Sequence, residues 1–457
     1  MKTKFKLISS LFASSLLLLS CDNSSDTSND LSVNSSTQKA SNLTARIAVS
    51  GNILALTYNV AGLPAIISSS SPDANTAKIG QLIRNYDIVN VQEDFNYHAK
   101  LYENDNHPFR TATSGGVPFG DGMNTLSRYS FVDFERVKWN SCNGTDCLTP
   151  KGFTFMRLRL KEGVYVDYYN AHPNAGSATA DLNARKSNIA QLSNYMKIKS
   201  NGNAVILMFD SNCRYTRSGD NIRLLMDNNG LTDAWIKLIR NNNIPALGSP
   251  ALDCDASNIT NTCEEVDKIF YKSNNQITLT ASNFSINNPL FVDGAGVPLS
   301  DHFPTAVNFA WSQNDLYTAS DLFGGPHGDI FSDITLLSAT SKVNKIVLRG
   351  GNRVDKVSFV LSNGTTLSHG GNGGTEKSLV LNTGEFINSV NMCSGKKDGR
   401  TRIFYIELKT NQNRTIATGT KTSDVFNYIV PAGYQITGFF GRSATEVDQL
   451  GFFGVSL

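Results

Sequence analysis

The chain has 457 residues, of which 40% are hydrophobic and 18% charged, and its formal net charge is +2. This length exceeds one ordinary hydrophobic core, so two or three domains are expected. Because the net charge is close to zero, binding of nucleic acid through overall positive charge is excluded. Only a local basic groove could bind nucleic acid.

The first 21 residues have the pattern of a bacterial lipoprotein signal peptide. Three lysines precede an apolar run, residues 8–19, that is too short to cross a bilayer. The run leads to Cys21, the residue that would carry the lipid. We therefore expect an exported protein, either anchored to a membrane (periplasmic or at the cell surface) through Cys21 or secreted. An ordinary signal peptide with an incidental Cys is the alternative. Residues 22–44, rich in Ser, Asn and Asp, are predicted to be a flexible linker.

Six of the seven cysteines follow Cys21. Because short loops in exported proteins are commonly closed by disulfides, we predict two bridges, Cys142–Cys147 and Cys254–Cys263. Cys213 and Cys393 are expected to be free thiols.

Strands and helices alternate between residues 45 and 311. The hydrophobic patterns predict strands at 52–58, 86–92, 204–209, 268–271 and 277–281, a hairpin of 153–160 with 164–170, and helices at 77–85, 181–196 and 220–228. Helices that cover a two-layer, mainly antiparallel β core fit this order. From residue 321 to 457 strands separated by glycines replace this pattern, which predicts a separate all-β domain. The boundary falls near residue 315, where we expect the two domains to be separable.

Several predicted strands of the first domain begin or end at a polar residue that can do chemistry. Alone, each such residue is more often a turn former. A carboxylate after a buried strand is costly, however, unless it binds a metal or a hydrogen-bond donor. The residues concerned are Asn59, Glu93, His172, Asp210, Asn212, Asp267, Asp301 and His302.

The order of these motifs resembles the endonuclease/exonuclease/phosphatase superfamily, which includes pancreatic deoxyribonuclease and the bacterial neutral sphingomyelinases. The matching stretches are Thr57-Tyr58-Asn59, Gln92-Glu93, His172, Asp210-Ser211-Asn212, Asp267 and Ser300-Asp301-His302. The resemblance implies a four-layered α/β sandwich and metal-dependent cleavage of a phosphoester. It departs at Phe209, where Gly is usual, and at Pro173, which follows His172.

The resemblance also implies a role for each residue. Glu93, with Asn59 close by, would hold Mg²⁺ or another divalent cation such as Ca²⁺ or Mn²⁺. His302, oriented by Asp301, would be the general base. Asp210 and Asn212 would position the attacking water and the phosphoryl oxygens. His172, partnered by Asp267, would donate a hydrogen bond to the phosphate or protonate the leaving group.

The resemblance further implies a phosphodiester substrate, in a phospholipid head group or in nucleic acid. Residues 169–176 resemble the sphingomyelinases more than the nucleases, so a phospholipid head group is preferred. Two alternatives stay open: a secreted deoxyribonuclease-like nuclease, and a glycan-binding adhesin with an inactive enzyme-like domain.

Residues 321–457 resemble the jacalin-like lectins, which fold as a β-prism. The resemblance rests on Phe323-Gly324-Gly325, the Gly-rich run 369–375 and the segment from Phe440 to Gly451. It implies a cell-surface glycan as partner, and no obligate protein partner is evident. Ala444 stands where the family usually has Gly. The implied sugar site comprises Gly325, Gly371, Asn372, Gly373 and Asp448.

Overall fold

The computed structural model describes residues 49–64, 71–115 and 120–457. The expectations for residues 1–44, including lipidation of Cys21, lie outside this range. Among the described residues no helix has both the length and the apolar character needed to cross a membrane.

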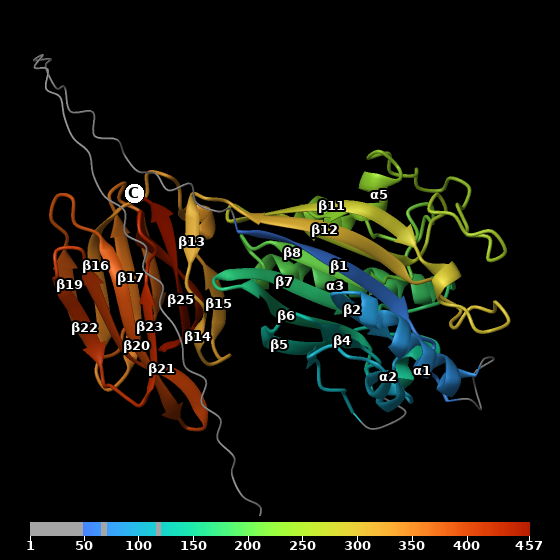
Figure 1. The fold of residues 1–457 in the computed structure, drawn as a ribbon, viewed down its shortest axis with the longest axis horizontal. Coiled ribbons are helices and arrows are strands. Elements are labelled where there is room, and N and C mark those ends of the chain that lie inside the picture. The colour runs from blue at the N-terminus through green and yellow to red at the C-terminus, as the bar shows by residue number, and fades with distance from the viewer. Residues whose placement is uncertain (1–48, 65–70, 116–119) are drawn as a thin grey trace, which may run out of the picture. The chain divides into compact units, whose positions relative to one another are not determined.

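Two six-stranded sheets form the centre of the first domain (Figure 1). Neighbouring strands are mainly antiparallel, as predicted, but β1–β2 and β7–β8 pair in parallel. The first sheet has the order β11 (Ile277–Ile286), β12 (Thr305–Gln313), β1 (Ser50–Asn59), β2 (Ile88–Gln92), β4 (Asn124–Ser127), β3 (Phe109–Arg110). The second has the order β5 (Phe131–Lys138), β6 (Gly152–Lys161), β7 (Val164–Ala171), β8 (Val205–Asp210), β10 (Asp267–Lys272), β9 (Thr232–Asp233).

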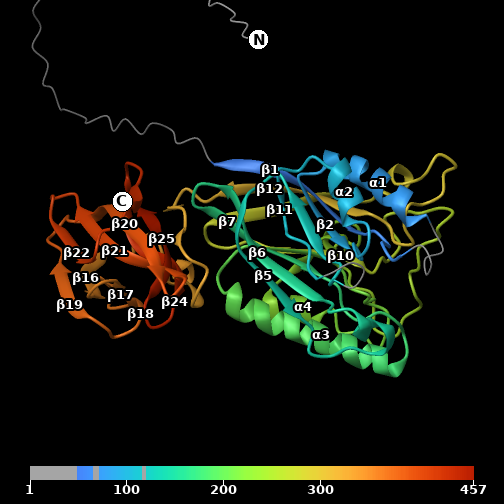
Figure 2. The same cartoon turned by 90° about the horizontal axis from the view of Figure 1, so that it is seen from below.

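Helices cover the outer faces of both sheets, which confirms the four-layered sandwich. Leu56 and Tyr58 point from β1 into a cluster that includes Ile79 of α1 and Leu101 of α2. Ile53 and Ala55 point the other way, into the core shared with the second sheet, because side chains alternate along a strand. Figure 2 shows α3 running along the second sheet. The helices are α1 (Pro72–Leu82), α2 (His98–Asn104), α3 (Thr179–Lys199), α4 (Leu224–Asn229) and α5 (Ala234–Leu238).

The predicted helix 181–196 extends slightly at both ends, to Thr179–Lys199, and the other two predicted helices begin at different places. The predicted helix 77–85 begins earlier, because Pro72 suits the first helical turn, and it ends in a 3₁₀ turn, Ile83–Asn85. The predicted helix 220–228 begins only at Leu224. Asp220 does not cap the helix, because its carboxylate accepts hydrogen bonds from the side chain of Arg185 and from the backbone amide of Arg214.

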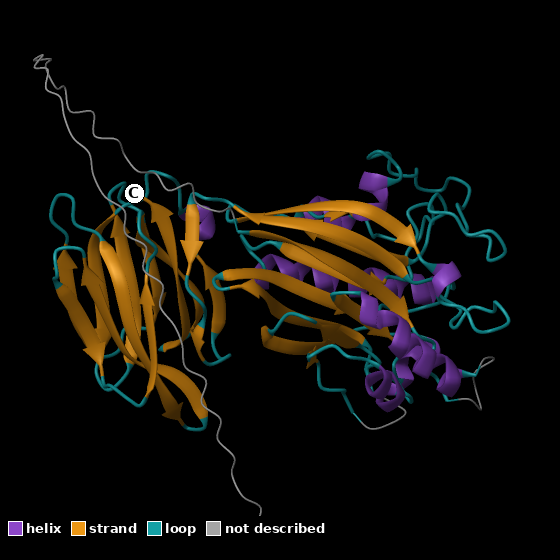
Figure 3. Cartoon of the chain, viewed as in Figure 1, coloured by secondary structure: helices purple, strands orange, loops and turns teal. Residues whose placement is uncertain are grey.

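Residues 317–457 are strands with a single 3₁₀ turn, Ile334–Leu336, as Figure 3 shows. Nine strands form one sheet system: β13 (Tyr317–Ala319), β14 (Phe323–Gly324), β15 (Asp329–Ser332), β20 (Ile387–Lys397), β21 (Arg400–Thr410), β22 (Thr415–Gly419), β23 (Asp424–Ile429), β24 (Tyr434–Ser443) and β25 (Val447–Ser456). Four more form a second sheet: β16 (Val343–Gly350), β17 (Val354–Leu361), β18 (Thr366–Gly370) and β19 (Thr375–Val380). Apolar residues of both sheets share one core, so the all-β domain is confirmed.

Asp321 ties the start of the all-β domain to the first domain. Its carboxylate accepts hydrogen bonds from Arg159 at 2.8 and 2.6 Å, from the Tyr165 hydroxyl at 2.9 Å and from the Gly163 amide at 3.1 Å. Burial alone would raise the pKa of Asp321, but these donors hold it below its ordinary value. The carboxylate is therefore ionised and bound at neutral pH.

Arg442 makes a second connection, and its side chain is only 3% exposed. It contacts Asp133 at 3.3 Å and Glu135 at 2.8 Å, both on β5. Gln449 donates to the same Asp133, at 3.3 Å. Because buried charges cross between the domains, a cut near residue 315 would remove partners from charged groups of the first domain.

Candidate active site

Parallel strand pairing brings four of the predicted site residues to one end of the sandwich. In the first sheet, β1 and β2 run parallel with Asn59 opposite Gln92, so Glu93 follows directly beside Asn59. In the second sheet, β7 and β8 run parallel with Ala171 opposite Phe209. His172 and Asp210 therefore leave the sheet side by side. Since parallel strands end at the same edge, the site lies at the carboxyl ends of both pairs.

His302 is oriented by Asp267 and not by Asp301, which corrects the sequence-based pairing. Nδ1 of His302 lies 2.8 Å from Oδ2 of Asp267. Asp267 opens β10 opposite Asp210 of β8, so the antiparallel register points it into the site. Asp301 is exposed, and its carboxylate lies 3.4 Å from the hydroxyl of Ser300. Adjacent residues in a turn need not point the same way, and here the neighbour in sequence points to solvent.

His172 is likewise not partnered by Asp267, which is a second correction. Its Nε2 lies 3.2 Å from Oδ2 of Asp210 and 3.8 Å from Oε1 of Glu93. The ring is almost fully buried, at 1% exposure. The parallel register of β7 and β8 makes Asp210, rather than Asp267, the carboxylate within reach.

Asn59 links the carboxylates of the two sheets. Its Nδ2 donates to Glu93 and to Asp210, both at 3.1 Å, while its Oδ1 accepts from the amide of Ala61. Glu93 has a positive φ of 56°, a left-handed conformation that is uncommon for residues other than glycine. In this arrangement Asn59 holds the carboxylates together; it would offer its oxygen to a cation only after its amide group rotates.

The departures at Phe209 and Pro173 leave the site intact. Phe209 packs against Phe270, with ring centroids 6.2 Å apart, in the core. Its side chain therefore points away from that of Asp210, its neighbour on the strand. The carbonyl of Pro173 accepts a hydrogen bond from Nδ2 of Asn212 at 3.3 Å, and the amide of Asn212 donates to Asp210 at 3.0 Å.

Burial and close charges set the protonation of the site. Burial would raise the pKa of Asp210, but the rings of His302 and His172 lower it below its ordinary value. Burial raises the pKa of Asp267 to about 6. Burial alone would lower the pKa of His302, yet the carboxylates of Asp267 and Asp210 raise it well above its usual range. His302 thus lies between the carboxylates of Asp267 and Asp210.

The oxygen donors fit a hard divalent cation. Glu93, with a side chain 21% exposed, presents a carboxylate at the opening of the site, and the carboxylate of Asp210 contacts the same Asn59 amide. Carboxylate oxygens suit Mg²⁺, Ca²⁺ or Mn²⁺. A second set, Asp210, Asp267 and His302, has ligand atoms within 4.8 Å of one another, but His302 and Asp267 already bond each other there. Glu93 with Asp210 is the better fit.

Three loops of the all-β domain converge where the sugar site was predicted. The Gly325 amide donates to the backbone oxygen of Asp448 at 2.8 Å, and a Cβ on Gly371 would lie 2.5 Å from the Thr445 oxygen. Asn372 and Gly373 follow Gly371 on the same loop, where the Arg349 side chain donates to both of their carbonyls at 3.1 Å.

The carboxylate of Asp448 does not face open solvent. Arg402 is paired with it, and the Asp448 side chain is 2% exposed. The predicted sugar-site glycines and Asp448 are therefore brought together, and the Asp448 carboxylate is paired with Arg402.

Comparisons with known proteins agree with both halves of this architecture. Residues 56–249 match the model of endonuclease/exonuclease/phosphatase family 2, and residues 320–453 match the jacalin-like lectin domain. The chain carries one domain of each kind. The first match ends before Asp267 and His302; the strand register places Asp267 in the site, and a hydrogen bond to Asp267 places His302.

Individual relatives cover one domain or the other. A sphingomyelinase of Mycobacterium tuberculosis is 38% identical over 270 residues, 57% of this chain and 53% of that protein. The chain thus spans about half the length of that relative. Horcolin of Hordeum vulgare is 26% identical over 114 residues, 24% of this chain and 78% of that protein. The solved structure of beta toxin from Staphylococcus aureus covers 56% of this chain and 99% of its own, with 19% identity and a TM-score of 0.42.

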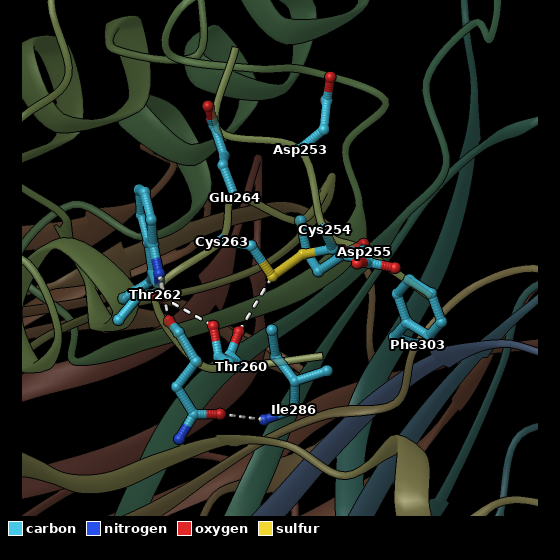
Figure 4. Close-up of a disulfide and its surroundings, with 12 residues drawn as sticks. Asp253, Cys254, Asp255, Thr260, Thr262, Cys263, Glu264, Ile286 and Phe303 are labelled. Carbon is cyan, nitrogen blue, oxygen red and sulfur yellow. Dashed lines mark hydrogen bonds between the residues drawn. A yellow bond between two sulfur atoms is a disulfide. The ribbon is translucent and has the colours of Figure 1, made fainter. Parts of the chain in front are cut away.

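Both predicted disulfides are present in the endonuclease/exonuclease/phosphatase domain, and Cys213 and Cys393 are free and buried. Figure 4 shows Cys254–Cys263 with Phe303, the residue after His302, among its surroundings. The carboxylate of Glu265 also lies within 4.8 Å of both sulfur atoms. The bridge therefore closes a loop beside the segment that leads into Asp267.

Lys151 is a site residue that the sequence analysis missed. Its ammonium lies 3.1 Å from Nε2 of His172 and 2.6 Å from Asp146, and its side chain is 8% exposed. Asp146 lies within the Cys142–Cys147 loop and accepts a hydrogen bond from the Ala175 amide. The predicted hairpin contained the clue, because pairing Phe153 with Ala171 brings Lys151 to the level of His172.

Replacing Lys151 with Met is expected to lower kcat about tenfold or more with little change in KM, because the change removes a buried cation at the ring of His172. Lys151→Arg should recover part of the loss. Steady-state kinetics of the purified variants measure both values. The matched control is Lys138→Met, an exposed lysine at the end of β5. Equal kcat for Lys151→Met and the control would exclude a role for Lys151 in turnover.

Proposed function

We propose that this protein is a metal-dependent phosphodiesterase that cleaves the head group of a sphingomyelin-type phospholipid, and that its jacalin-like lectin domain binds carbohydrate. One observation carries the enzymatic part. Two histidines, three carboxylates and Asn59, each from a different strand end, converge with contacts of 2.8 to 3.8 Å, in a domain of the endonuclease/exonuclease/phosphatase type. The preference for a phospholipid is supported by the 38% identity to a sphingomyelinase.

The chain's own residues divide the reaction between them. His302, held at Nδ1 by Asp267, would take the proton of the attacking water at Nε2. The neighbouring carboxylates raise the pKa of His302, so this role requires that Nε2 first loses its own proton, which a bound cation nearby would favour. Asp210, 3.7 Å from that nitrogen, orients the water. Nε2 of His172 accepts from the Lys151 ammonium at 3.1 Å, so the two residues would together supply a proton to the phosphate or the leaving oxygen. A divalent cation at Glu93 would offset the charge that develops on the phosphoryl oxygens.

The loop that leads into the site supports a lipid rather than a nucleic acid. Leu290 and Val297 are 63% and 56% exposed on the connection between β11 and β12, just before Ser300. Apolar side chains at this position suit contact with a membrane surface, whereas a polyanion calls for cations.

We further propose that the protein is exported and reaches a membrane through a lipid on Cys21, or is secreted. The pattern of residues 1–21 supports this placement. Mass spectrometry of the mature N-terminus tests it: a lipid-modified Cys21 is expected, and an intact Met1 in the mature protein would contradict export.

The proposed activity is tested by assaying the full-length protein on sphingomyelin vesicles, double-stranded DNA and a soluble phosphodiester, each with Mg²⁺ and with a chelator. We expect release of phosphocholine from sphingomyelin that the chelator abolishes. Cleavage of DNA alone would assign the nuclease function, and inactivity on all three substrates would leave a binding protein.

Glu93→Gln is expected to lower kcat at least about a hundredfold, because the change keeps the size of the side chain but removes the charge that holds the cation. Kinetics and Mg²⁺ titration calorimetry of the same preparation measure turnover and metal affinity. Glu103→Gln, on the exposed side of α2, is the matched control. A Glu93→Gln enzyme with normal Mg²⁺ affinity would remove Glu93 from the metal site.

A further inference from the structure

A tight hairpin of the jacalin-like lectin domain carries an excess of positive charge beside the predicted sugar site. Its turn, Asp398-Gly399, joins β20 to β21, and both residues have positive φ, as the hairpin turn requires. This register places Lys397 directly opposite Arg400. Like charges opposite each other destabilise a hairpin, so the arrangement costs folding free energy unless an anion lies nearby.

The hairpin forms one wall of a pocket of about 270 Å³, close to the lower end of the volumes of small-molecule sites. The opposite wall is the turn between β24 and β25, the turn against which Gly371 packs. The pocket is lined by Lys397, Asp398, Arg400, Arg402, Thr445 and Glu446. It therefore adjoins the Gly-rich loop of the predicted sugar site.

Of the two carboxylates that line the pocket, Glu446 is already paired, and Asp398 stands in the hairpin turn. Glu446 accepts hydrogen bonds from Arg353 at 2.9 and 2.5 Å. Arg402 lies 3.6 Å from Glu446 and is also paired with Asp448, just outside the pocket. Lys397 lies only at the edge of ion-pair distance, 3.7 Å from Glu446. Among the described residues Arg400 has no carboxylate partner. The pocket consequently presents cations to a ligand.

The buried pairing also changes which sugar can bind. A neutral sugar would use Asp448 to accept its hydroxyls, but Arg402 occupies that carboxylate. A sugar that carries its own carboxylate or sulfate can instead bond to the guanidinium groups, which bind such groups in a bidentate manner. Burial and the charges of Arg402 and Arg400 also lower the pKa of His327, so the positive potential extends across the site.

We propose that this pocket binds an acidic sugar, one with a carboxylate or sulfate group, through Lys397, Arg400 and Arg402. The proposal rests on the carbohydrate binding proposed above and names its ligand class. The anion would lie between the two opposed cations and relieve their repulsion, while the backbone around Gly325 and Gly371 accommodates the ring.

The test compares two ligands that differ only in charge. Full-length protein is titrated by calorimetry with an oligouronate and with the same oligosaccharide after its carboxylates have been reduced to hydroxymethyl groups. We expect at least about tenfold tighter binding of the charged form, and weaker binding as salt rises. Arg400→Glu and Lys397→Glu should each remove most of this preference. Lys409→Glu, exposed on the same strand β21 but at its far end, should keep it.

The outcomes separate this proposal from carbohydrate binding as such. Equal affinity for both ligands would overturn the acidic-sugar proposal and leave carbohydrate binding standing. Binding of neither ligand, nor of a panel of neutral sugars, would overturn both. An equal loss in Lys409→Glu would mean attraction by overall charge, which overturns the proposed pocket. Binding to sugar-free anionic vesicles without binding to the oligouronate would reassign the pocket to lipid.

Discussion

Replacing His302 with Ala is expected to lower kcat by about two to four orders of magnitude, because the change removes the group that takes the proton of the attacking water. Steady-state kinetics on the substrate cleaved by the wild-type protein measure the loss, and circular dichroism checks the fold. Added imidazole should restore part of the rate, since it replaces the missing ring. A variant that keeps the wild-type rate would exclude His302 as the general base.

The same experiment distinguishes the two aspartates that compete as partners of His302. Asp267→Asn is expected to lower kcat about tenfold or more, because Asp267 holds Nδ1 at 2.8 Å. Asp301→Asn is the matched control, and it should stay within about twofold of the wild type because Asp301 is exposed. A larger loss in Asp301→Asn than in Asp267→Asn would restore the pairing that the sequence suggested.

The second large effect is expected at the contact between the domains. Arg442→Met should lower the free energy of unfolding by about 3 kcal/mol, because the buried carboxylate of Asp133 loses its nearer arginine and keeps only Gln449 at 3.3 Å and Arg157 at 3.9 Å. Urea unfolding followed by circular dichroism measures the change. Limited proteolysis should also cut residues 314–321 faster in the variant, because these residues connect the two domains and the substitution weakens the contact between the domains.

Arg349→Met provides the comparison, because it removes an ion pair whose Glu376 side chain is 52% exposed. Its expected cost is at most about 1 kcal/mol. Equal stability of the two variants would mean that the Arg442 contact contributes no more than a surface pair. The domains would then be separable near residue 315 after all.

Much of the fold follows from local patterns. The strand at 204–209 is continuous and apolar because β8 is buried on both sides, and the hairpin of β6 with β7 has the predicted limits to within a few residues. The starts of helices were harder to predict. The helix predicted from residue 220 begins at Leu224, because Asp220 bonds to the buried Arg185, a contact that no local pattern reveals.

The amino-acid sequence by itself determined which residues gather in the active site, because strand ends of one sandwich meet at a common edge and carry Asn59, Glu93, His172 and Asp210 there. It also determined the two short disulfide loops, because two cysteines that lie near each other in the sequence have few alternative partners.

Only the tertiary structure decided which of these groups touch. The antiparallel register of β8 and β10 sets Asp267 opposite Asp210 and beside His302, while Asp301, the neighbour in sequence, faces solvent. The ion pairs of Arg402 with Asp448 and of Arg442 with Asp133 likewise depend on how the strands pack in the folded chain. Side-chain direction and strand register are set by how distant apolar residues pack into a common core, and adjacency along the chain carries no information about that packing.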